Sequence, residues 1–193
     1  MQQDRCSALK NNQMKLIITF LLIIVSNAIL GQSKTYSTRT VASNFETEEI
    51  LKEFDGKVEI HEKSGTNTYK YFAFDTETND VIELQTYILS KNDSTLIIIS
   101  PDDTDPESFG VIFKLCDRIE VESNNTNSEI LVFAGKDMEG LGNTYFNRNF
   151  GLIQSIFNPR KLISNIYVYD QQECLNDNII IKLKEKTRYN MLQ

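Results

Sequence analysis

Short alternating segments at regular spacing constrain the fold of this chain more than any other feature. From Lys57 onward they recur every ten to fifteen residues or so, separated by turn-prone clusters such as TETND, KNDS and LNDN. No segment of crossover-helix length lies between them, which favours antiparallel pairing. The sequence therefore predicts a mainly β protein, an antiparallel meander that forms a sandwich, half-barrel or barrel. The expected strands cover 57–62, 68–74, 81–90, 95–100, 111–122, 129–134, 150–157, 162–169 and 179–186.

One stretch near the N-terminus has the pattern of a helix instead. Ser43-Asn44-Phe45-Glu46 reads as a capping box, and Asp55-Gly56 reads as a stop signal. The apolar residues between them fall on roughly one helical face. We therefore expect one short N-terminal helix, at about residues 43–55, with a polar linker over 32–42 in front of it.

The expected strand over 111–122 contains a break in its own pattern. Its apolar residues occupy odd positions, yet Asp117 falls on the same face. A lone buried carboxylate is costly. The sequence therefore predicts a β-bulge near Cys116–Asp117, which would turn the carboxylate out of the core.

The N-terminal region predicts export. An apolar run from Leu16 to Val25 follows Lys15 and is shorter than the roughly 20 residues that span a bilayer. We interpret 1–31 as an N-terminal extension plus a cleaved signal peptide with its core at 15–31, and 43–193 as a single β-rich domain. Cleavage after Ala28 and after Gly31 both fit, and translation from Met1 and from Met14 both remain open.

The expected location follows from this leader. Cys6 precedes the apolar run, so it cannot accept a lipid at the cleavage point. The predicted mature protein is secreted or periplasmic, is not lipid-anchored and has no transmembrane segment.

Charge and cysteine content narrow the possible partners. Residues 1–31 carry three basic side chains and one acidic one, so cleavage would change the net charge from −7 to −9. An acidic chain repels phosphate backbones, which argues against nucleic acid. Cys116 and Cys174 would remain, and in an oxidising compartment they are a disulfide candidate; two unrelated free thiols are the alternative.

The sequence contains no recognisable catalytic or metal-binding motif. His61 is the only histidine, and no Gly-x-Ser-x-Gly stretch presents a nucleophile. The acidic cluster at 75–80 lacks the glycine and glutamate of a calcium loop, and both this cluster and the one at 103–107 read as turns. We assign no catalytic residue, no metal and no cofactor.

Aromatic residues give the one suggestion of a ligand site. Tyr145 and Phe146 lie close together, and Tyr167 and Tyr169 follow on a later expected strand. Such side chains line grooves for glycans, peptides or apolar ligands. The alternative is that a chain without Trp packs its core with Phe and Tyr.

Two phrases, AILGQS and NFGLIQSI, carry a resemblance. In them the chain resembles small uncharacterised secreted β-rich proteins of Bacteroidota-type bacteria, whose leaders end just before Gln and whose sheets carry a Tyr…Gly-Leu-Ile phrase, here Tyr145 to Ile153. Some of these proteins are half-barrels similar to envelope lipoprotein carriers. The resemblance implies export and a β-sheet, and it brings no catalytic residues.

These observations favour a binding role. We expect an exported soluble monomer that binds an envelope component, a protein, a glycan or a small apolar molecule. A secreted hydrolase that uses carboxylates, through Asp117 or Glu83, is the first alternative. A structural surface protein without a small-molecule site is the second.

Overall fold

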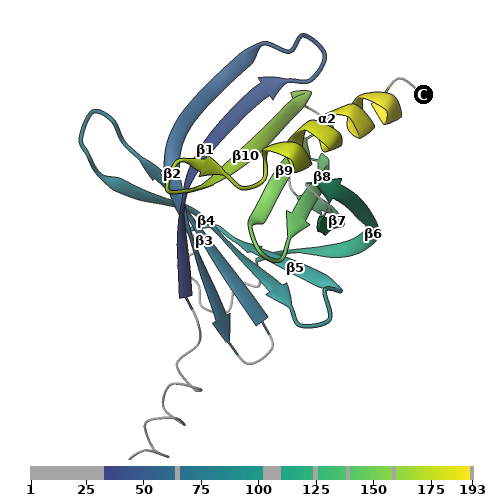
Figure 1. Ribbon diagram of the computed structural model, residues 1–193, viewed down its shortest axis with the longest axis horizontal. Coiled ribbons are helices and arrows are strands. Elements are labelled where there is room, and N and C mark those ends of the chain that lie inside the picture. The colour runs from purple at the N-terminus through teal and green to yellow at the C-terminus, as the bar shows by residue number, and fades with distance from the viewer. Residues whose placement is uncertain are drawn as a thin grey trace, which may run out of the picture. The chain divides into compact units, whose positions relative to one another are not determined.

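Ten antiparallel strands form a closed barrel in the computed structural model, which describes residues 33–63, 66–101, 110–123, 126–137, 140–157 and 160–191 (Figure 1). Each strand pairs with the next one in the sequence, and β10 pairs back with β1, so the expected antiparallel meander closes as a barrel. The strands are β1 (Ser33–Asn44), β2 (Ile50–Lys63), β3 (Thr66–Phe74), β4 (Val81–Ser90), β5 (Thr95–Ile99), β6 (Val111–Ser123), β7 (Thr126–Asp137), β8 (Gly140–Asn147), β9 (Gly151–Phe157) and β10 (Leu162–Asp170). The short β11 (Glu173–Cys174) adds to β10, and helix α2 (Asp177–Met191) follows.

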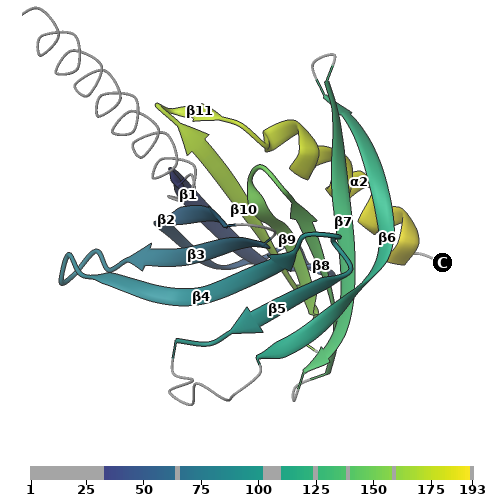
Figure 2. The same ribbon diagram turned by 90° about the horizontal axis from the view of Figure 1, so that it is seen from below.

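The apolar residues form two clusters on opposite sides of the barrel wall. One lies inside the barrel and includes Val58, Tyr69, Leu96, Phe133 and Ile166. The other lies on the outer face of β6 to β10, where the buried α2 residues Ile179, Ile180 and Leu183 cover it. Figure 2 shows α2 lying across this part of the wall. Strands in this half of the barrel therefore bury both of their faces.

The predicted bulge in β6 is confirmed, and it allows this strand to contribute side chains to both clusters. The register with β7 shifts between Leu115 and Asp117, and Asp117 Oδ1 accepts a hydrogen bond of 2.8 Å from the Arg118 backbone. Phe113, before the bulge, packs inside the barrel, whereas Ile119, after it, packs under α2. The bulge thus lets one strand bury its two halves on opposite faces.

Three tyrosines fill the barrel interior where β3 and β4 face β8 and β9. The Tyr69 ring meets Phe146 edge to face at 4.7 Å between centroids, and the Tyr71 ring meets Tyr87 in the same way at 5.5 Å. Tyr69 donates to the Arg148 carbonyl at 2.7 Å, and Tyr71 accepts from the Leu152 N–H at 2.6 Å. These hydrogen bonds tie the rings to the β8–β9 turn, so this part of the interior is packed core.

The predicted N-terminal helix at 43–55 is wrong, and so is the linker over 32–42. From Ser33 these residues form β1, a tight turn and the start of β2. A different side chain from the one predicted caps this segment, and it closes a hairpin: Asn44 Oδ1 accepts from the Glu46 and Thr47 backbones, and Glu48 adopts a positive φ of 61°. Asx turns use the same side chain–backbone bonds as helix caps.

The strand predicted over 179–186 is also wrong, because these residues belong to α2. Ile179, Ile181 and Leu183 alternate as in a strand, but Ile179, Ile180 and Leu183 also form a helical stripe. Burial selects the helical pattern, since those three side chains are at most 2% exposed while Ile181 is 46% exposed.

Strand β8, rich in glycine at its start, lies between the expected strands at 129–134 and 150–157 and was not among those expected. On the neighbouring β7, Gly135 pairs with Gly142 of β8 and makes room for a ring: an added Cβ at Gly135 would lie 2.2 Å from Cδ1 of Phe113. Glycine inside a strand often marks such a close approach.

Candidate functional site

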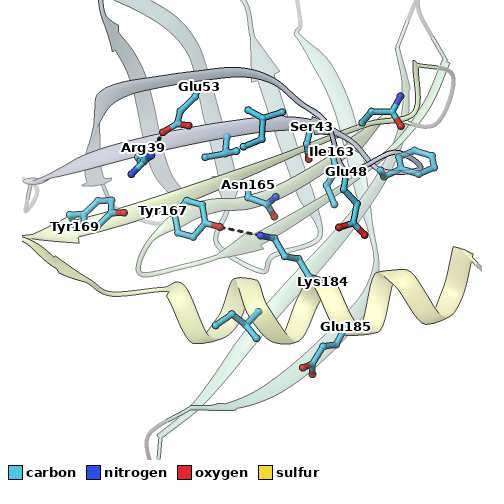
Figure 3. A pocket seen from close by; sticks show the side chains of 15 residues that line it. Arg39, Ser43, Glu48, Glu53, Ile163, Asn165, Tyr167, Tyr169, Lys184 and Glu185 are labelled. Carbon is cyan, nitrogen blue, oxygen red and sulfur yellow. Dashed lines mark hydrogen bonds and ion pairs between the residues drawn. The ribbon is translucent and has the colours of Figure 1, made fainter.

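A groove of about 670 Å³ lies on the outer face of the barrel, beside α2 (Figure 3). Its floor comes from β1, β2 and β10, one end is formed by the β1–β2 turn, and α2 forms the facing wall. The volume is in the range of small-molecule sites. The lining residues are Arg39, Val41, Ser43, Asn44, Phe45, Glu48, Ile50, Glu53, Ile163, Asn165, Tyr167, Tyr169, Ile181, Lys184 and Glu185.

The register of β1 against β10 sets the order of side chains along the floor. Val41 is opposite Asn165 and Arg39 is opposite Tyr167, so these side chains share the outer face. Alternate residues of β10 run along the floor from Ile163 to Tyr169. The six steps from Ile163 to Tyr169, at about 3.3 Å each, give a floor about 20 Å long.

Helix α2 is held in place by a side chain that continues the strand ladder. Asn176 Oδ1 accepts from the Val168 N–H and its Nδ2 donates to the Ile166 carbonyl, both at 2.8 Å. Asn176 is fully buried, so these bonds satisfy both its own amide and the β10 backbone. This anchor fixes where α2 leaves the barrel and how its wall faces the floor.

A pair of amides interrupts the otherwise apolar centre of the floor. Gln154 Nε2 on β9 donates to Asn165 Oδ1 at 2.8 Å, and both residues are almost fully buried. Gln154 Oε1 has no hydrogen-bond partner among the described residues. A buried amide with one orphan acceptor is costly. Gln154 itself does not line the groove, so Asn165 is the member of the pair that a ligand in the groove can contact.

The charged groups of the groove are of both signs. Arg39 forms an ion pair with Glu53, and this carboxylate raises the pKa of the guanidinium. Lys184 Nζ lies 3.2 Å from the Tyr167 hydroxyl, across the groove, as Figure 3 shows. Burial raises the pKa of Tyr169, with the Cys174 thiol as a second cause. The phenol of Tyr169 therefore stays neutral at physiological pH.

The four aromatic residues proposed from the sequence separate in the structure. Tyr167 and Tyr169 line the groove. Tyr145 and Phe146 are neighbours on β8 and point to opposite faces: Tyr145 packs in the outer cluster and Phe146 inside the barrel. Their adjacency in the sequence is what separates them, because side chains alternate along a strand.

Cys116 and Cys174 are both free, so the predicted disulfide is not formed. Cys116 is at the β6 bulge and Cys174 is on β11, and the strands β7 to β10 stand between them in the sheet order. Burial raises the pKa of both thiols, with Asp117 a second cause at Cys116. Raised pKa values leave little thiolate, so neither side chain is activated as a nucleophile.

The other groups considered from the sequence lie apart from the groove. Asp117 is exposed on β6, Glu83 on β4 accepts from Thr86 at 3.0 Å, and His61 is exposed on β2. Asp75 accepts from the Glu77 and Thr78 backbones, which lower its pKa, so that cluster is a turn. The cluster at 103–107 lies outside the described residues. Within the described ranges, no three His, Cys, Asp or Glu side chains are grouped as a metal site would require.

Most groove residues gave no signal in the sequence. Arg39 and Val41 lie in a polar stretch that reads as a linker, and Ile181 and Lys184 lie in an apparent strand. The groove forms only because β10 closes the barrel onto β1 and α2 returns over it. The helical stripe in the C-terminal segment is the one local pattern from which the α2 wall of the groove could have been predicted.

The fold and groove define a closed antiparallel barrel whose outer face carries a ligand-sized groove beside a C-terminal helix. Comparison with known proteins adds no family, since no family model and no curated protein matches the chain. Within the part of the chain that the structure describes, no helix has the length and apolar character needed to cross a membrane.

Proposed function

We propose that this protein is a binding protein, and that it holds a small, mainly apolar molecule in the groove between α2 and the β1–β2–β10 face. The observation that carries this proposal is the groove itself: about 670 Å³ in volume, with aliphatic side chains on both the floor and the helix wall. Val41 and Ile163 supply the floor, and Ile181, 46% exposed, supplies the wall. A ligand that covered these side chains would gain about 25 cal/mol for each Å² of apolar surface buried.

The leader supports a setting outside the cytoplasm. The apolar run from Leu16 to Val25 has the length and flanks of an export signal, and the chain as a whole is acidic. We therefore propose that binding takes place in the periplasm or the cell exterior. The groove favours a binding role over a purely structural one. A structural role would not explain why aliphatic side chains on the floor and on α2 face each other across an open groove.

Titration with phenylnaphthylamine, an uncharged apolar dye whose fluorescence rises on binding, tests the site. Ile181→Trp places a bulky ring in the groove, and we expect it to weaken dye binding about tenfold or more. Ile112→Trp is the matched control, because Ile112 is similarly exposed, at 50%, on β6 and away from the groove. Equal affinities for the two variants, or no dye binding by the parent protein, would refute the proposed function.

A further inference from the structure

The amide pair in the floor determines which polar group a ligand can offer. Asn165 Oδ1 already accepts from Gln154, whereas its NH₂ makes no hydrogen bond with the described residues, so the NH₂ is the group with the greater need of a partner. Nothing in the described part of the chain accepts a hydrogen bond from this NH₂, although Asn165 lines the groove. An NH₂ group donates and cannot accept. A ligand oxygen that acts as an acceptor is therefore the complementary partner.

The charged residues of the groove disfavour an anionic ligand. Two cations, Arg39 and Lys184, and three carboxylates, Glu48, Glu53 and Glu185, line it. Arg39 is already paired with Glu53, and Lys184 Nζ contacts the Tyr167 hydroxyl. The net charge of the lining is negative, as is that of the whole chain at −7. A carboxylate or phosphate would therefore meet repulsion without an uncompensated cation to offset it.

We propose that the ligand is an uncharged amphiphile with an ester, ether or carbonyl oxygen partway along an apolar body. The oxygen accepts a hydrogen bond from Asn165 Nδ2, and the body lies along Val41, Ile163 and Ile181. This inference rests on the proposed function, since it names the ligand class of the same groove. Asn165 acts here as a specificity-determining residue, and Gln154 as the residue that orients it.

A pair of ligands matched in length isolates the hydrogen bond. Methyl hexanoate and octane have chains of equal length but only the first carries an ester, and both can be titrated as competitors of the dye. The variant Gln154→Leu with Asn165→Leu replaces both amides, so that neither is left without its partner. We expect the affinity ratio of ester to hydrocarbon to fall about fivefold in this double variant, the value of one hydrogen bond.

A spectroscopic measurement on the parent protein makes the test independent of how the double variant folds. In ¹⁵N–¹H spectra, methyl hexanoate is expected to shift the Asn165 side-chain NH₂ signals, and octane at equal occupancy is expected to leave them in place. An unchanged affinity ratio, or equal shifts with both ligands, would overturn the hydrogen bond while leaving a groove that binds apolar molecules. Failure of both ligands to displace the dye would instead count against the proposed function.

The charge argument has its own test with hexanoate, the anion of the same chain. The parent protein is expected to bind methyl hexanoate more tightly than hexanoate. Glu53→Gln leaves Arg39 without its carboxylate, and the preference should then move toward hexanoate by about threefold. Glu46→Gln is the matched control, because Glu46 pairs with Lys161 and does not line the groove. A tighter complex with hexanoate in the parent protein, or equal changes in the two variants, would overturn the uncharged ligand.

Discussion

The three tyrosines inside the barrel should make the fold unstable at alkaline pH. Burial raises the pKa of Tyr69 to about 12, and it also raises the pKa values of Tyr71 and Tyr87 well above the ordinary value of a tyrosine. In the unfolded chain a tyrosine titrates near pH 10. Because the pKa values are raised in the folded state, the stabilisation from these three phenols is complete below about pH 10. It is lost as the pH rises from there through the folded-state pKa values.

The size of the effect follows from the number of protons. Above about pH 10 the folded state retains three phenolic protons that the unfolded state releases. Each retained proton contributes about 1.4 kcal/mol per pH unit, so the free energy of unfolding should fall by about 4 kcal/mol per unit from these three groups. A domain stabilised by roughly 5 to 15 kcal/mol would then unfold within a few pH units.

Tyr87→Phe is the informative perturbation. Its hydroxyl donates to the partly exposed Gln85 at 2.9 Å, so the loss at neutral pH is modest. The alkaline slope, however, should decrease by about a third, to roughly 2.7 kcal/mol per pH unit. Urea unfolding at a series of pH values gives the slope, and absorbance at 295 nm, the usual phenolate wavelength, counts the phenolates that appear.

Phe146→Leu serves as the control. It removes a ring that contacts Tyr69 but no ionisable group, so it should lower stability at every pH without changing the slope. If the slope of Tyr87→Phe equalled that of the parent protein, or if all tyrosines ionised before unfolding, the reasoning from buried phenols would be refuted.

Three further substitutions test the contacts that hold the barrel and its helix. Asp93→Asn replaces a carboxylate that is 7% exposed and accepts hydrogen bonds from Arg118 and Arg148. We expect the free energy of unfolding in urea to fall by about 2 kcal/mol, and an unchanged midpoint would contradict this. Asn176→Ala leaves the Val168 N–H and Ile166 carbonyl unpaired, which should cost about 2 to 4 kcal/mol and speed hydrogen exchange at Val168; native-like protection there would exclude the anchor. Gly151→Ala forces a Cβ onto a residue with φ +83° and to within 2.2 Å of the Tyr71 hydroxyl; a melting temperature equal to that of the parent would show that the β8–β9 turn tolerates a side chain.

The sequence predicted those features that depend on residues close together in the chain. Alternation and turn clusters gave most of the strands, and Asp117 on an apolar face gave the β6 bulge. The capping box over 43–46 placed a side chain–backbone contact in the right segment, but the acceptor is Asn44 and not the Ser43 hydroxyl. Its consequence was misassigned, because the same hydrogen bonds that begin a helix also close a hairpin.

The tertiary structure decided the features that depend on which face of an element is covered. Residues 179–183 fit a strand and a helix equally well, and only the outer cluster of β6 to β10 selects the helix by burying Ile180. The groove likewise exists because Val41 on the first strand meets Asn165 on the tenth. Periodicity within a segment says which side chains share a face, but the partner of that face comes from distant parts of the chain, and burial against that partner fixes the structure.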